Sequence, residues 1–218
     1  MAKRGETATI KRLNEKTASF ILMGTTVYVQ NKFSSKARQQ LHDAHAAGST
    51  AKSKNKKEVK DFQAMYEASI HRDEDGRTGI PVIALRRAII RACKLAGYVM
   101  ADAKVGIFVE PDGFDPDDFQ SLFHFTKGEP EYFESMVRVG QNKPDIHPRG
   151  LWRPGWEAVA RIRFDGDAYT LNDIGNLLYR AGKQVGIGEG RPDSRFSAGM
   201  GWGLFDIKNP PEGENDEG

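Results

Sequence analysis

Alternating and continuous runs of apolar residues divide the chain into predicted strands and helices. The run TASFILMGTTVYVQ (17–30) is rich in β-branched and aromatic residues and lacks proline, which predicts a first strand. GIPVIALRRAIIRACKLAG (79–97) predicts a long helix, with Pro81 near its first turn and Gly97 at its end. VGIFVEP (105–111) predicts a second strand.

A third strand is predicted by strict alternation in WEAVARIRFD (156–165). Small or apolar residues occupy every second position, and Arg161 and Arg163 lie between them. Side chains of a strand point alternately to its two faces, so this pattern predicts one apolar face and one largely basic face. The two arginines are therefore candidates for binding a nucleic-acid backbone.

A second helix follows, and a last strand ends the fold. Thr170 and Asp173 have the spacing of a capping box, and LNDIGNLLYRAG carries one apolar stripe that Gly182 is expected to end. The sequence GMGWGLFDI then predicts a strand over 200–207.

In chain order these elements read β-α-β-β-α-β, the ferredoxin-like, RRM-like pattern of the α+β class. Residues 34–78 and 112–155 are expected to be insertions. We expect the four strands to form one antiparallel sheet, with helices 82–95 and 171–181 on the same face.

Composition predicts one cytoplasmic domain. The 218 residues are 39% hydrophobic, enough to bury a core over 1–208, whereas 209–218 carry four acids and no base and are expected to be a disordered tail. The formal net charge is +2. Cys93, the single cysteine, excludes an internal disulfide and is expected to be a buried thiol. No run of 18 apolar residues or signal peptide is present, so no membrane partner is expected.

The segment VGIGEGRPDSRFSAGMGWGLFDI (185–207) holds six glycines and two arginines. Its G-x-G-x-G does not follow a strand and open a helix, and it lacks the Gly-Lys-Ser/Thr of a Walker loop. A glycine-rich turn can still present backbone amides to an anion, and the candidate residues are Gly186, Gly188, Gly190, Arg191 and Arg195. Alternatively, Gly199, Gly201 and Gly203 give room for packing against Trp202.

Other basic residues are candidates for the same ligand. Arg87 and Arg91 share an exposed arc of the long helix with Lys94, whereas Arg86 falls in the apolar arc and either snorkels past its neighbours or holds an anion. Residues 49–60 form a lysine-rich stretch that is either a solvated loop or an arm that follows a phosphate backbone; its candidates are Lys52, Lys54, Lys56 and Lys57.

Aromatic residues crowd the second insertion beside basic ones. Aromatic side chains interleaved with bases are typical of proteins that stack on unpaired bases, but they also form small cores. We expect the phenylalanines in the core and take Trp152, in PRGLWRPG, as the best stacking candidate.

Catalytic and metal-binding patterns are weak. His42 and His45 share one face of a predicted helix and are the only candidate catalytic residues, although exposed surface histidines are the simpler interpretation. The acids around 110–118 miss the spacing of a calcium loop and are interpreted as a turn. We expect no metal and no cofactor.

Two motifs resemble the RAMP superfamily, the RNA-binding proteins of CRISPR effector complexes. GIPVIALRRAII is similar to its isoleucine-proline segment, with Arg86 at the arginine of that motif. GIGEGRPDSRFSAGMGWGLFDI is similar to its C-terminal glycine-rich loop. The chain also resembles tailed-bacteriophage proteins of about this size, and this resemblance implies the cytoplasm of the host cell as its location. The resemblance implies single-stranded nucleic acid held along a basic face, with both insertions over the strand.

The leading hypothesis is non-enzymatic binding of single-stranded nucleic acid, RNA favoured over DNA, with self-association along the strand. One alternative is a metal-independent endoribonuclease that uses His42 or His45. The other is a phage protein–protein module, either a virion component or a decoy of a host CRISPR complex.

Overall fold

The computed structural model describes residues 11–32, 60–139, 143–194 and 199–208, with single residues at 39, 42, 43 and 46. The fold is mixed α/β and is built on a curled antiparallel sheet. Among the described residues, no helix is long and apolar enough to cross a membrane.

The four predicted strands lie in this main sheet. They are β1 (Glu15–Gly24), β4 (Ile107–Glu110), β9 (Glu157–Asp165) and β10 (Phe205–Lys208). β1 pairs with β10 on one side and with β9 on the other, and β9 pairs with β4; every pairing is antiparallel. The predicted single antiparallel sheet is therefore confirmed.

The second insertion, interpreted from its sequence as irregular or as a hairpin, contributes strands beyond the four predicted ones. β6 (Gln120–Lys127) joins the main sheet beside β9, and pairs in turn with β3 (Gly79–Pro81) and β5 (Gly113–Asp115). β7 (Glu131–Val139) and β8 (Lys143–Trp152) form a hairpin.

The predicted first strand is in fact two strands in two sheets. β1 ends at Gly24, and β2 (Tyr28–Gln30) pairs with β8 in a smaller sheet of order β2-β8-β7. A Cβ on Gly24 would lie 2.0 Å from the Trp156 ring. Gly24 therefore lets the indole cross the end of β1, and there the chain turns away.

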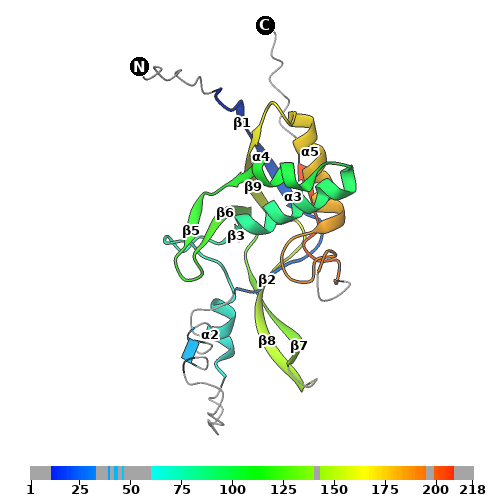
Figure 1. Ribbon diagram of the computed structural model, residues 1–218. Helices are drawn as coiled ribbons and strands as arrows, with labels where there is room; N and C mark the ends of the chain where they lie inside the picture. Colours follow the sequence, from blue (N-terminus) through cyan, green and yellow to red (C-terminus); the bar gives the residue numbers. More distant parts are fainter. Residues whose placement is uncertain are drawn as a thin grey trace, which may run out of the picture.

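Three helices lie together against the main sheet, above the smaller sheet in the view of Figure 1. They are α3 (Val82–Ala96), α4 (Met100–Gly106) and α5 (Leu171–Arg180), and α3 contacts both others. The predicted helices α3 and α5 thus share one face of the sheet. The short helix α2 (Phe62–Glu67) instead contacts β8.

Local sequence signals explain how these helices begin and end. Thr170 caps α5 through the predicted capping box, in which the Thr170 N–H donates to Asp173 Oδ2 at 2.8 Å. Gly97, with φ of 81°, ends α3. The expected stop at Gly182 is wrong, because the chain continues as a π-helical turn, η1 (Ala181–Val185), to Gly186. A Cβ on Gly182 would lie 2.2 Å from the Phe205 carbonyl oxygen, so this glycine permits close approach to β10.

The core lies between the main sheet and the helices. The apolar face of β9, predicted from its alternation, is buried against Ile89 of α3 and Ile174 of α5 in one cluster that also holds Cys93. Burial raises the pKa of the Cys93 thiol, which agrees with an unreactive side chain.

Candidate functional site

The glycine-rich segment forms a loop that is hydrogen-bonded to two other parts of the chain. The Glu189 N–H donates to the Val29 carbonyl oxygen at 2.9 Å, and the Ile187 N–H donates to that of Gly203 at 3.0 Å. The Met200 N–H donates to the Gly190 carbonyl oxygen at 2.7 Å. The loop is thus held against β2 and against residues 200–203.

Glycines of this loop are required by packing within the protein. Gly188 has φ of 79°, and a Cβ there would lie 2.6 Å from the Tyr28 ring. A Cβ on Gly190 would lie 2.5 Å from the Trp202 ring. Packing within the protein therefore accounts for Gly188 and Gly190 without a ligand. The glycine that lies against the Trp202 ring is Gly190, whereas Gly199, Gly201 and Gly203 were expected there.

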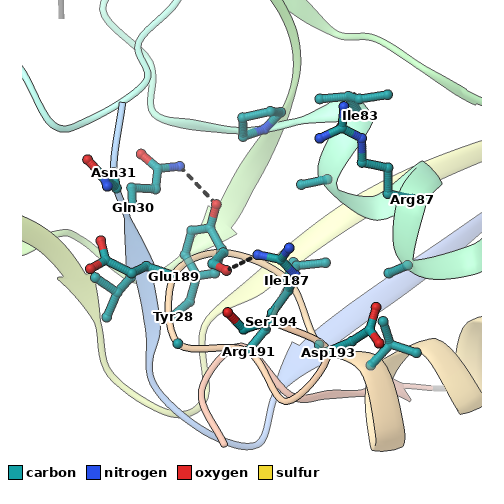
Figure 2. Close-up of a pocket in the computed structure, with 18 of the residues that line it drawn as sticks. Tyr28, Gln30, Asn31, Ile83, Arg87, Ile187, Glu189, Arg191, Asp193 and Ser194 are labelled. Carbon is teal, nitrogen blue, oxygen red and sulfur yellow. Dashed lines mark hydrogen bonds between the residues drawn. The ribbon is translucent and has the colours of Figure 1, made fainter. Parts of the chain in front are cut away.

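A cleft of about 680 Å³ opens between this loop, β2 and the first turns of α3. Figure 2 shows Gln30 and Asn31 on the β2 side, Arg87 on α3, and Arg191 on the loop. His71, from the segment between α2 and β3, also lines the cleft.

The first turn of α3 lies beside this cleft. Pro81 is the N-cap, and its side chain makes no capping hydrogen bond. The first amides of a helix carry a partial positive charge, so an anion beside them is stabilised. Because Pro81, Ile83 and Ala84 all line the cleft, this charge acts within it.

Two guanidinium groups of the cleft have no carboxylate partner among the described residues. Arg191 Nη1 donates to the Gly188 carbonyl oxygen at 3.0 Å, a neutral acceptor that leaves the charge uncompensated. Arg87 is exposed and forms no hydrogen bond or ion pair within the described part of the chain. The structure therefore brings together two arginines that lie 104 positions apart in the sequence.

Two other arginines are ion-paired with the loop. Arg91 Nε lies 2.9 Å from Asp193 Oδ1, which ties α3 to the loop. The nearly buried Arg149, which was not among the predicted binding residues, lies 2.7 Å from Glu189 and ties β8 to the loop. Arg91, a predicted binding residue, is thus a positioning group in the free protein.

Buried beside the cleft is a polar cluster that sequence reasoning also missed. The fully buried Asp115 carboxylate lies 2.8 Å from Lys32 Nζ and 2.9 Å from His71 Nδ1. Burial by itself would raise the pKa of Asp115, but hydrogen bonds from Lys32 and His71 hold that pKa below its usual value. The acids of 110–118 do form a turn, since Asp115 also accepts the Asp117 N–H at 3.0 Å.

Arg86 lies outside the cleft, and its contacts agree with one of the two interpretations of this residue. Its Nε donates to the Ile107 carbonyl oxygen at 3.1 Å, its Nη2 donates to that of Lys104, and its guanidinium lies 4.8 Å from the centre of the Phe108 ring. Arg86 therefore reaches past its apolar neighbours to cap the end of α4, as the first interpretation expects, and anion binding by this residue stays a prediction.

The basic face of β9 is largely neutralised. Arg161 lies 2.7 Å from Asp112, and Arg163 lies 2.6 Å from Glu110 and 2.7 Å from Glu15. Neither arginine lines the cleft. The structure thus corrects the prediction that these two residues offer free positive charge.

The expectation that Trp152 stacks on a nucleic-acid base is wrong. Its side chain is fully buried, and its ring is stacked on Phe125 with centroids 4.7 Å apart. Among the phenylalanines, Phe123 is buried as expected, but Phe119 is 70% exposed.

The remaining candidates lie on the surface or outside the described residues. The His42 side chain is 76% exposed, as its simpler interpretation predicts. Lys52, Lys54, Lys56, Lys57, His45, Arg195 and the tail 209–218 lie outside the described residues. Within the described ranges, no group of three or more His, Cys, Asp or Glu residues could hold a metal ion.

Comparison of the chain with models of known protein families and with curated proteins gives no match.

Proposed function

We propose that this protein binds single-stranded nucleic acid, with RNA as the favoured form, and that backbone phosphates occupy the cleft between α3 and the glycine loop. The observation that carries the proposal is the pair of uncompensated guanidiniums of Arg87 and Arg191 beside the uncapped amides of α3. Arginine guanidinium groups and the backbone N–H groups at helix N-termini both commonly bind phosphate.

The strand order supports a ferredoxin-like core as part of this proposal. β1 and β4, which flank α3 in the chain, are separated in the sheet by β9. β9 and β10, which flank α5, are separated by β1. Two such split β-α-β units make the ferredoxin-like pattern, and the resemblance of this chain to RAMP proteins implies the same core.

The number of unpaired arginines determines the expected salt dependence of binding. Arg91, Arg161 and Arg163 are paired with carboxylates, so they neutralise no phosphate unless those pairs break. Arg87 and Arg191 neutralise about one phosphate each. Each single-strand phosphate adds about 0.7 to the slope of log K against log salt, so the pair contributes about 1.4.

The test is fluorescence anisotropy of a labelled 12-nucleotide oligouridylate, titrated at several salt concentrations. We expect the double variant Arg87→Ala/Arg191→Ala to bind more weakly and to flatten the salt slope by about 1.4.

Lys94→Ala is the matched control, because Lys94 is exposed on the same helix two turns beyond Arg87 and does not line the cleft. It should leave affinity and slope close to those of the unmodified protein. If the double variant folds and retains both its affinity and its slope, the cleft does not bind the strand.

A further inference from the structure

His71 combines deep burial with one ring nitrogen that is open to the cleft. The residue is only 6% exposed, yet it lines the cleft. Its Nδ1 is bonded to Asp115. Its Nε2 makes no hydrogen bond to any described residue. This nitrogen is nevertheless accessible to solvent.

The surroundings fix which nitrogen carries the proton in the free protein. Asp115 is ionised, because Lys32 Nζ and the Asp117 N–H both donate to its carboxylate. An ionised carboxylate at 2.9 Å holds the proton on Nδ1, so Nε2 presents a lone pair to the cleft.

Burial keeps the imidazole neutral until a counter-charge arrives. Desolvation lowers the pKa of His71; the Asp115 and Asp118 carboxylates oppose this effect, and the Lys32 ammonium reinforces it. A phosphate in the cleft would add a negative charge on the Nε2 side. The imidazolium would then lie between two anions, an arrangement that favours the charged form.

We propose that His71 Nε2 takes up one proton from solvent when a backbone phosphate enters the cleft, and then donates a hydrogen bond to that phosphate. Nδ1 keeps its proton and its bond to Asp115 throughout. The inference rests on the proposed function, since the phosphate is that of the bound strand. It assigns His71 as a binding residue and makes strand binding proton-linked.

The experiment is isothermal titration calorimetry of the full chain with the 12-nucleotide oligouridylate at pH 7.5, in two buffers of different ionisation enthalpy. The difference in observed enthalpy gives the number of protons taken up. We expect uptake approaching one proton, and a Kd that rises up to about tenfold per pH unit above pH 7.

Two histidine variants give the matched comparison. His71→Asn can still donate to Asp115 but cannot take up the proton, so uptake should fall to zero and the Kd should lose its pH dependence. His124→Asn changes a second histidine whose side chain is partly buried. His124 pairs with Asp73 at 2.9 Å and does not line the cleft. It should keep the uptake.

The outcomes separate the two proposals. Binding by the unmodified protein with no proton uptake overturns the role of His71 and leaves the proposed function standing, and this result needs no variant. Uptake that persists in His71→Asn overturns it as well. Absence of binding at every pH and salt concentration overturns both.

Discussion

Replacing Asp115 with alanine tests whether the buried cluster beside the cleft is an electrostatic unit. The change would leave the Lys32 ammonium, whose side chain is 4% exposed, without its buried partner, and would remove the acceptor of His71 Nδ1. Removing one member of a buried ion pair costs about 3–5 kcal/mol, because the remaining charge is desolvated without compensation. The contact of Lys32 with the more exposed Asp117, at 3.2 Å, places the expected loss toward the lower end of that range.

Urea denaturation followed by circular dichroism measures this loss. With a slope of about 2–3 kcal/mol per molar urea, the midpoint should fall by about 1 M or more. Adding Lys32→Met to Asp115→Ala should recover part of the loss, because the unpaired charge is then gone. Glu131→Ala, which breaks the exposed pair of Glu131 with Arg153, serves as the control and should not shift the midpoint measurably. A midpoint for Asp115→Ala equal to that of the control would refute the electrostatic account.

Two further predictions concern pH and the glycine loop. The pKa of His71 is lower in the folded protein than in the unfolded chain, so the unfolded chain binds the extra proton as pH falls. The free energy of unfolding should therefore decline below about pH 6.5. His71→Asn should remove that decline in urea titrations across pH 5–8. The pKa of Asp115 is also lowered, which adds a second loss of stability below about pH 4. Gly188→Val should lower the melting temperature, because its Cβ would lie 2.6 Å from Tyr28; unchanged melting with lost oligonucleotide binding would show instead that the ligand needs the glycine.

The main elements of the fold were predictable because their signals are local. Alternation identifies β9, the pair Thr170 and Asp173 marks the start of α5, and Gly97 marks the end of α3. The missed features depend on distant partners. The break between β1 and β2 requires the Trp156 ring, which lies 132 positions after Gly24.

The same distinction applies to the site. Arg87 and Arg191 were identified as candidates because basic residues on an exposed helix arc and in a glycine loop are visible in the sequence. Which basic residues remain free was not visible. The partner of Arg163 on β1 is Glu15, 148 positions away, and Asp115 is 44 positions from His71.

The ion pairs of Arg91 and Arg149 make the cleft a preorganised binding site. Asp193 and Glu189 hold the loop to α3 and β8 through Arg91 and Arg149, so the walls of the cleft are fixed before any ligand enters. A fixed site loses little conformational entropy on binding, which partly offsets the small number of free charges. A low net charge is thus compatible with strand binding if the few free cations are placed in advance, and the salt slope of the unmodified protein should be shallow for the same reason.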